Sequence, residues 1–357
     1  MDAALAHQCK PPPTGDPWRG APCKSSGCRR HRRTHGIDHG PPPFGPHNAS
    51  AGWPTAVPEA AVCPRDGITS CCRADGFGGQ LETLIDVFVF SVVAGRTFCH
   101  YPWWKMEHGQ KPAAMFEFVG GPNWGPRACA DTFAMQHYAH HKVPREWGYG
   151  ESRRFAQEQL GAAFIRREVR RRYLSTPKPP LSWFTPAGGA EAGGATVQIA
   201  LHLRQGDILK HSYHAWRRVG SDEALACVRF ASAALGGTAA SHQRLHVMSE
   251  GEEAGVAYFD ALRGPRFHVE LHLSRPLKET FHHMVEADAL IMAPSGLSFA
   301  AVPLSRGRVF YPPALLRPGH GIPSFWMGME PCFEGNGTAI AAKHEVERLG
   351  WVPGRLG

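Results

Sequence analysis

The chain has 357 residues, enough for two domains, because a domain usually contains about 100–200 residues. Hydrophobic residues make up 43% and charged residues 20% of the sequence, which is typical of a globular protein and excludes a chain that is disordered throughout. The net charge is +8, so we expect an anionic partner, although nucleotides, nucleic acids and acidic glycans all meet this condition.

Residues 1–60 are rich in Pro, Gly, Arg and His and have no hydrophobic period, which predicts a disordered basic tail. The tail contains Cys23, Cys28, His31 and His35 in the order of zinc ligands. Only two residues separate Cys28 from His31, whereas a zinc finger needs about 12 at this point. We therefore expect a solvated, charged tail rather than a zinc site.

Targeting signals are not evident. No window reaches the roughly 18 apolar residues that span a bilayer, and the first residues lack the apolar core of a signal peptide. We expect no transmembrane segment in this chain. Sequons for N-glycosylation at Asn48 and Asn336, and ten cysteines, an even number compatible with disulfides, leave the compartment open.

Residues 61–185 are predicted to form an N-terminal α/β domain. Its glycine segment, Asp75 to Gly79, lacks the Walker lysine and follows no convincing strand, although Gly76 and Gly78 would let backbone amides approach a ligand. Apolar residues at helical spacing over 81–92 predict a helix that stops at Gly95, and "RTFCHYPW" then predicts a strand.

A long helix is predicted from Glu151 through "AAFIRREVRRRYL", with a solvated arginine face. The Pro-rich and Gly-rich run that begins at Ser175 predicts the domain boundary.

Residues 186–357 are predicted to form a Rossmann-like domain. Short apolar strands alternate with helices, which predicts a parallel, doubly wound α/β sheet with right-handed crossovers. The expected strands are 196–203, 244–249, 266–273, 288–295 and 308–313, and the expected helices are 221–235, 253–262, 277–287 and 296–305. Ligands of such sheets bind outside the carboxyl ends of the strands.

Polar residues follow the first of these strands in the hexapeptide "HLRQGD", which contains His202, Arg204, Gly206 and Asp207. An arginine at the carboxyl end of a strand can donate two hydrogen bonds to a phosphate, and a glycine lets the backbone turn beside it. A surface ion pair between Arg204 and Asp207 explains these residues equally well.

A second polar group follows the strand at 288–295. Ser295 and Ser298 begin a helix, and the free amides of a helix N-terminus favour anions. Ser295 or Ser298 could equally be only a helix cap. Because two strand ends of one sheet can each bind an anion, we favour the interpretation that a diphosphate is bound between Arg204 and Ser295.

The helix at 277–287 offers further polar groups. Glu279 and Thr280, at its start, are placed to hydrogen-bond a base or ribose. His282 and His283 are neighbours in sequence, and such neighbours on a helix do not face the same ligand. We therefore expect at least one of them to be a packing or surface residue.

The order of "DGFGGQLE", "HLRQGD", "SEG" and "ETFHHMVEADALIMAPSGLS" resembles the fucosyltransferase superfamily, which contains α1,2-, α1,6- and protein O-fucosyltransferases, and is most similar to its algal and plant relatives. The resemblance covers residues 73–326. The chain departs from the family pattern at Gly79, where Asn is common, and at Gly296, where a second Ser is common.

The resemblance implies a GT-B architecture, in which two Rossmann-like domains face a cleft, and inverting transfer from GDP-fucose to a glycan or glycoprotein without a metal or other cofactor. It also implies a Golgi or secretory location. Arg204 matches the arginine that contacts the donor β-phosphate, and His202 and Asp207 complete that motif. Ser295 matches a phosphate-side serine, and Glu279 or Thr280 lies near the acidic position that holds guanine.

No general base is identified by the sequence. Asp75, Glu82 and His100 are candidates, each with a structural role as the stronger alternative. The alternative function is a non-catalytic nucleotide-binding or glycan-binding protein that retains the fold. A nucleic-acid partner, bound through the tail and the Arg166 to Arg172 helix, is not expected, because no nucleic-acid module accompanies these residues.

Overall fold

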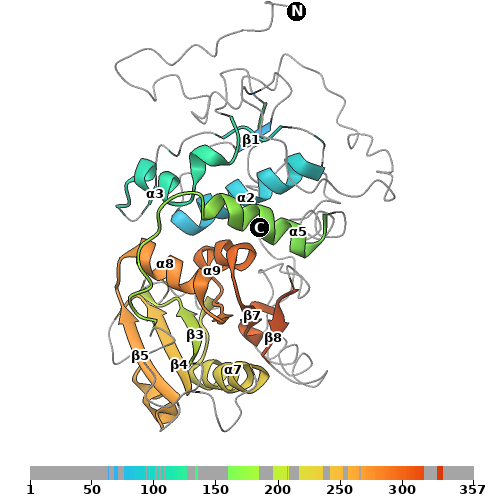
Figure 1. The fold of residues 1–357 in the computed structure, drawn as a ribbon. Helices are drawn as coiled ribbons and strands as arrows, with labels where there is room; N and C mark the ends of the chain where they lie inside the picture. Colours follow the sequence, from blue (N-terminus) through green and yellow to red (C-terminus); the bar gives the residue numbers. More distant parts are fainter. Residues whose placement is uncertain are drawn as a thin grey trace, which may run out of the picture. The chain divides into compact units, whose positions relative to one another are not determined.

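The protein is described by a computed structural model, shown in Figure 1. The structure describes residues 63, 68–70, 76–93, 95, 97–100, 103, 106–107, 109–126, 133–135, 160–184, 196–206, 208, 217–235, 242–251, 256–264, 267–316 and 328–332. Three sets of predictions lie outside these residues, namely the tail at 1–60, Asp75 and Asp207.

The chain divides into two compact units. The first comprises residues 1–161 and 171–176, and the second comprises residues 162–170 and 177–357. Helix α5 (Ala162–Tyr173) contributes residues to both units. The continuous helix predicted from Glu151 is wrong at Gly161, where a φ of +76° interrupts the helical path between Leu160 and α5. Glycine adopts this left-handed conformation without the steric cost of a Cβ.

The first unit contains a two-stranded parallel sheet, formed by β1 (Ile68–Ser70) and β2 (Phe133–Met135). Its helices are α2 (Phe77–Val93), α3 (Pro112–Phe118) and the 3₁₀ turn η1 (Gly121–Asn123). Three predictions are corrected. A short strand, β1, does precede the glycine segment; Gly78 lies inside α2 rather than in a loop; and the described residues of "RTFCHYPW", 97–100 and 103, have only single bridges, at Phe98 and His100.

Aromatic side chains form the core of the first unit. Phe88 of α2 makes edge-to-face contacts with Phe98 and Trp124, with ring centroids 5.8 Å and 5.3 Å apart. The guanidinium of Arg172 lies 4.3 Å from the Phe88 ring centroid, and Arg172 is 1% exposed. The predicted solvated arginine face is therefore wrong for Arg172, because a cation over an aromatic ring is stabilised in the interior.

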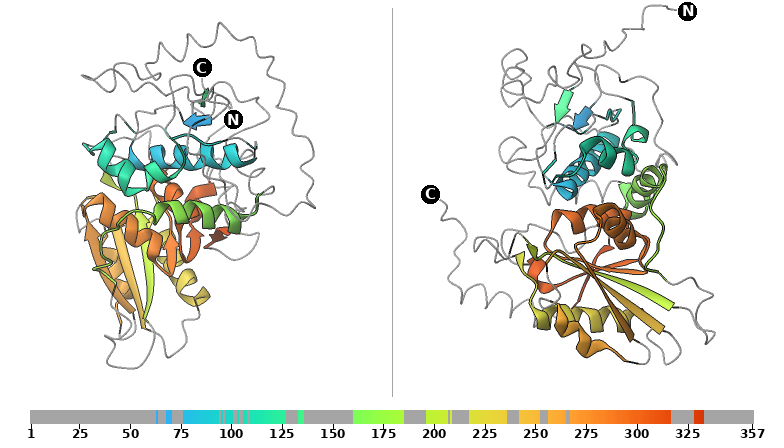
Figure 2. Two further views of the ribbon diagram at one scale, coloured as in Figure 1. Left: turned by 45° about the horizontal axis from the view of Figure 1, so that its top comes forward. Right: turned by 90° about the vertical axis from the view of Figure 1, so that its left-hand side faces the viewer.

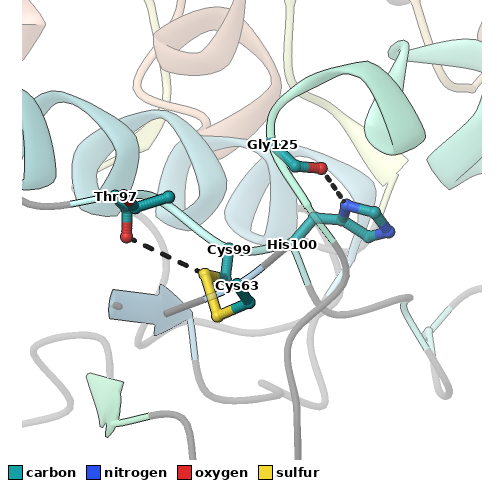
Figure 3. The surroundings of a disulfide bond; sticks show 5 residues. All are labelled: Cys63, Thr97, Cys99, His100 and Gly125. Carbon is teal, nitrogen blue, oxygen red and sulfur yellow. Dashed lines mark hydrogen bonds between the residues drawn. A yellow bond between two sulfur atoms is a disulfide. The ribbon is translucent and has the colours of Figure 1, made fainter. Parts of the chain in front are cut away.

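A disulfide joins Cys63 to Cys99 in the first unit (Figure 3). Beside it, His100 Nδ1 lies 2.6 Å from the carbonyl oxygen of Gly125. A carbonyl oxygen only accepts hydrogen bonds, so Nδ1 carries the ring hydrogen and donates it. This contact ties the segment after α2 to the segment after η1, and it gives His100 a structural role.

The second unit is built on a six-stranded sheet in which every pair of neighbouring strands is parallel. The strands are β3 (Thr196–Leu203), β4 (His242–Ser249), β5 (Phe267–Leu273), β6 (Ala289–Ile291), β7 (Arg308–Tyr311) and β8 (Glu330–Pro331). Their order in the sheet is β5-β4-β3-β6-β7-β8. The parallel, doubly wound α/β sheet predicted for the C-terminal half is confirmed.

Helices cover both faces of this sheet (Figure 2). On one side lie α7 (Ser221–Ala234) and the 3₁₀ segment η4 (Ala257–Leu262), and on the other α8 (Leu277–Glu286) and α9 (Gly296–Ala301), which η5 (Val302–Leu304) extends. The 3₁₀ turn η6 (Pro313–Leu316) follows β7. The α-helix predicted over 253–262 is thus a short 3₁₀ segment, since Gly264 and Pro265 follow it closely and do not continue a helix.

The two faces of the sheet differ in chemistry. Ile199, Leu245 and Val269 share one row of the sheet and pack into the apolar cluster that includes residues of α7 and η4. Side chains of a strand alternate between faces, so the neighbouring row, which contains Ala200, His246 and Glu270, faces the side of α8. The second face therefore carries polar side chains under its helices.

Arginine side chains of α5 also bind within the second unit. Arg170 donates to both carboxylate oxygens of Glu286, at 2.6 Å and 2.7 Å, and to the carbonyl oxygen of Leu304 at 2.7 Å. Both bonds to Glu286 come from Nη2 of Arg170, and hydrogen bonds between ionised groups of this kind are stronger than neutral ones. The predicted solvated face is therefore wrong at Arg170 as well.

A second disulfide joins Cys227 of α7 to Cys332, which follows β8. Both cysteines are buried and belong to the apolar cluster on the α7 face. The bridge links the central helix to the edge of the sheet. Separately, none of the helices in the described ranges combines the length and apolarity needed to cross a bilayer.

Candidate functional site

The strand order of the second unit reverses between β3 and β6. If β3 is counted as the first strand of this sheet and β8 as the sixth, the spatial order is 3-2-1-4-5-6. This is the strand order of a Rossmann-type sheet. Ligands of such sheets bind outside the carboxyl ends of the two strands at the reversal. Arg204 follows the end of β3, and Ser295 follows β6 by four residues. The structure therefore places both residues at one edge of the sheet, at its switch point.

A direct hydrogen bond connects the two strand ends. His202, at the end of β3, has its Nδ1 2.6 Å from Ser298 Oγ in the first turns of α9. The same Ser298 oxygen accepts a hydrogen bond from the backbone N–H of Ala293 at 3.1 Å. Both side chains are buried. His202 and Ser298 thus brace the floor of the switch point from its two sides.

The charge state of His202 follows from its surroundings. Burial, together with the smaller effect of the nearby positive charge of Arg204, lowers the pKa of His202 to about 3. The imidazole is therefore neutral at physiological pH. It can hold Ser298 in position, but it does not add a second cation for a phosphate, so Arg204 carries the positive charge at the end of β3.

Acid is expected to destabilise the fold through His202. A histidine with a depressed folded pKa stabilises the protein fully above the unfolded value of about 6.5, and this contribution is lost as the pH falls towards 3. His202 alone should lower the free energy of unfolding by up to about 1.4 kcal/mol per pH unit below 6.5. Urea unfolding of wild type and His202→Gln between pH 7 and 5 should show a shallower slope in the variant. Equal slopes would contradict the burial argument.

The turn after β3 passes close to the turn after β4. Gly206 has a φ of +28°, and a Cβ added there would overlap the carboxylate of Glu250. Glycine is favoured at this position by its backbone angle, and a larger residue would also have to displace the Glu250 side chain. The close approach brings the backbone after Arg204 against the end of β4.

A second arginine reaches the switch point, and the sequence analysis did not identify it. Arg217, which precedes α7, donates from Nε to the carbonyl oxygen of Pro294 at 3.0 Å. Pro294 is the residue before Ser295. The two residues are 77 positions apart, so no local spacing in the sequence connects them. Arg217 fixes the segment between β6 and α9 from the opposite side of the reversal.

Ser295 caps its own helix. Its hydroxyl oxygen accepts the backbone N–H of Leu297 at 3.3 Å, and Ser295 is the residue before the six-residue helix α9. The cap alternative is therefore what the side chain does in the structure. Its match to a phosphate-side serine stays a prediction.

Glu279 and Thr280 lie near the start of α8. Glu279 Oε1 accepts a hydrogen bond from Ser182 Oγ at 2.9 Å, and its backbone carbonyl accepts one from His283 Nδ1 at 2.8 Å. The backbone N–H of Thr280 donates to the carbonyl of Pro276. Because α8 follows β5, its first turn lies at the carboxyl edge of the sheet.

Trp183 lies between two histidines of the second unit. Its ring stacks on His272 and on His283, with centroids 3.9 Å and 4.0 Å apart. The backbone N–H of Trp183 donates to His283 Nε2 at 3.1 Å. His283 is therefore a packing residue, as expected for at least one of the paired histidines. Trp183 comes from the Pro-rich run, where composition gave no sign of a packed residue.

The remaining candidates lie in the first unit. Gly76 precedes α2, while Gly78 and Glu82 lie within it and are buried. Together with the structural contact of His100, these positions bring no described group of the first unit into a catalytic arrangement. The second unit alone assembles His202, Arg204, Gly206, Ser295 and Ser298.

No protein-family model matches the sequence, and no curated protein matches it. Two solved structures of Escherichia coli heptosyltransferase WaaC, one with ADP-2-deoxy-2-fluoro heptose and one with ADP, are similar at TM-scores of 0.34 and 0.33 and identities of 12% and 13%. The matches cover 80% and 79% of this chain and 99% of each WaaC chain. At TM-scores this low, the likeness does not identify the function of this chain.

Proposed function

We propose that the protein is a glycosyltransferase that transfers fucose from GDP-fucose to a glycan or glycoprotein acceptor, with inversion and without a metal at the diphosphate. The observation that carries this proposal is the switch point. In a sheet of Rossmann order, Arg204 and the His202–Ser298 pair lie at the two strand ends where such sheets bind nucleotides. The GT-B arrangement of the two units is part of the proposal.

The proposed reaction places one task on Arg204. The acceptor hydroxyl oxygen attacks C1 of the sugar, the bond from C1 to the phosphate oxygen breaks, and GDP leaves with the electron pair. The acceptor proton passes to a base. Negative charge grows on the β-phosphate as that bond breaks, and a fixed guanidinium stabilises it. The brace formed by His202 and Ser298 keeps the end of β3, and hence Arg204, in position before reaction.

Guanine is the proposed base of the donor. Glu279, at the start of α8, offers a carboxylate at the carboxyl edge of the sheet, and a carboxylate accepts hydrogen bonds from the N–H groups of guanine. Adenine and uracil lack this paired set of donors. The resemblance of "ETFHHMVEAD" to the fucosyltransferase superfamily supports the same choice.

The proposed compartment is oxidising. Two disulfides join Cys63 to Cys99 and Cys227 to Cys332, and such bonds persist mainly in secretory and extracellular environments. A Golgi or other secretory location agrees with an acceptor that is a glycan or glycoprotein.

Thermal unfolding with nucleotides tests the donor site. In buffer with EDTA throughout, GDP at about 100 times its dissociation constant should stabilise the wild type by roughly 2.7 kcal/mol, while ADP and UDP should have much smaller effects. Arg204→Ala should lose the GDP effect because the β-phosphate loses its guanidinium. Arg229→Ala is the matched control, since Arg229 is exposed on α7.

Three outcomes separate the possibilities. Stabilisation by GDP that requires Arg204 supports the proposal. Equal stabilisation of wild type and Arg204→Ala would move the nucleotide site elsewhere and overturn the role of the switch point. GDP binding without turnover of GDP-fucose, in the presence of glycan acceptors, would favour a non-catalytic nucleotide-binding protein.

A further inference from the structure

Two histidines and a glutamate gather on the polar face of the second sheet, at its β5 edge. His246 of β4 pairs in register with Glu270 of β5, and His272 lies two residues further along β5. Residues two apart on a strand share a face, so all three side chains project to the side of α8. β5 is the edge strand of the sheet, as Figure 1 shows. The donor site argued above uses none of the three.

The three ligand atoms form a small triangle. His246 Nδ1 lies 3.0 Å from His272 Nε2, and each of these nitrogens lies 3.7 Å from Glu270 Oε2. A point equidistant from three atoms with these separations lies about 2.0 Å from each of them. Zinc bonds to histidine nitrogen at about 2.0–2.1 Å and to carboxylate oxygen at about 2.0–2.2 Å. The triangle therefore matches three zinc ligands without a change of side-chain conformation.

A hydrogen bond from His246 to Gln198 determines which ring nitrogen of His246 is available to bind a metal. Its Nε2 lies 2.8 Å from the side-chain oxygen of Gln198. An amide oxygen only accepts, so Nε2 carries the hydrogen of the neutral ring and Nδ1 has the free electron pair. Without a metal, that pair accepts a hydrogen bond from His272 Nε2, 3.0 Å away, and a bound metal would replace the shared hydrogen. Outer hydrogen bonds of this kind hold a metal-binding histidine in one tautomer and one orientation.

His272 is held by packing and by one hydrogen bond, between its Nε2 and His246 Nδ1. Its ring is 5% exposed and stacks on Trp183 at an interplanar angle of 11°. Its Nδ1 is buried and has no hydrogen-bond partner. The position of the ring is therefore set by Trp183 and the sheet, and its Nε2 meets His246 and Glu270 at the centre of the triangle.

The two carboxylate oxygens of Glu270 have different neighbours. Its Oε1 accepts a hydrogen bond from Arg244 at 2.6 Å, which leaves Oε2 directed at the two histidines. The Glu270 side chain is 33% exposed, whereas His246 is fully buried. The triangle thus has a closed side made by the histidines and a side open to solvent, where a water molecule can complete four ligands.

We propose that His246, Glu270 and His272 bind a zinc ion, with water as the fourth ligand, and that this ion clips the edge strand β5 to β4. Two imidazoles and one carboxylate suit a borderline cation such as Zn²⁺; Mg²⁺ and Ca²⁺ prefer oxygen ligands, and Cu(I) prefers sulfur. The bound ion also fixes the ring of His272 against Trp183. The site lies on β4 and β5, on the β5 side of the switch point, and does not depend on the proposed transferase activity.

The test uses the full chain stripped of metal with EDTA and dialysed. Titration with ZnCl₂, followed by calorimetry, should show one equivalent that the Glu270→Gln variant lacks or binds at least about 100-fold more weakly, because a zinc ligand is lost. Glu330→Gln is the matched control. Glu330 is a carboxylate of similar exposure, 36%, that also pairs with an arginine, Arg308, at the opposite edge of the sheet.

A spectroscopic measurement identifies the ligands. Co²⁺ should give visible absorption bands of a four-coordinate nitrogen and oxygen site in the wild type and in Glu330→Gln, and not in Glu270→Gln or His272→Gln. Binding by the tail residues Cys23 and Cys28 would instead give a thiolate charge-transfer band that all four proteins share. If wild type and Glu270→Gln bind Zn²⁺ with equal stoichiometry and affinity, the proposed site is wrong.

Discussion

Arg204→Ala is expected to lower the rate of sugar transfer by about 10²–10³-fold, with most of the loss in kcat. The guanidinium acts on charge that develops only as GDP departs, so its removal affects the transition state more than the bound donor. Turnover of GDP-fucose, with water and with a panel of glycans as acceptors, measures the effect. The reduction should be similar for every acceptor, because in the proposed reaction Arg204 acts on the donor.

Two further variants make this result specific. Arg204→Lys keeps the charge but not the paired donors, and it should recover only part of the rate, since a guanidinium binds phosphate through two parallel hydrogen bonds. Arg229→Ala should retain full activity, because Arg229 is exposed on α7. If Arg204→Ala had the wild-type rate, Arg204 would have no role in the reaction, and the proposed function of the charged group at the end of β3 would be wrong.

The second large effect is expected at the disulfide between Cys227 and Cys332. The two cysteines are 105 residues apart in the sequence. The segment between them contains five of the six strands of the second sheet, β4 to β8. Replacing both cysteines by alanine should lower the free energy of unfolding by about 2–4 kcal/mol, because the unfolded chain regains conformations that the cross-link removes. Urea unfolding of oxidised wild type and of the double variant provides the comparison.

A matched pair of measurements controls this prediction. Dithiothreitol should destabilise the wild type by a similar amount or more, since it also reduces Cys63–Cys99, and should have a smaller effect on the double variant. Mass spectrometry after thiol labelling without reduction should find Cys227 and Cys332 protected. Labelling of both residues in the native protein would show that the bridge does not form.

The elements of the second unit were largely predictable from the sequence. Strand β3 was predicted at its observed bounds, because the mainly apolar segment "TVQIALHL" is followed directly by Arg204. The failures have physical causes. Strand β8 has only two residues, one of them Pro331, so it carries no periodic signal, and its place is set by pairing with β7. The segment at 257–262 became a 3₁₀ turn because glycine and proline follow it.

The candidate donor site was predictable in part, because alternating strands and helices imply a parallel sheet, and such a sheet brings Arg204 and Ser295 to one edge. The partners of these residues were not predictable. His202 binds Ser298 from 96 positions away, and no spacing in the sequence relates them.

The sequence by itself determined most of the strands and helices of the second unit and the charged residue that follows β3, since these properties depend on local hydrophobic period and on turn residues. Only the tertiary structure decided which side chains meet. The zinc triangle needs the register of β4 against β5, and Trp183 reaches His272 across 89 positions of the chain. Such contacts depend on the pairing and packing of distant segments, and local periodicity carries no information about them.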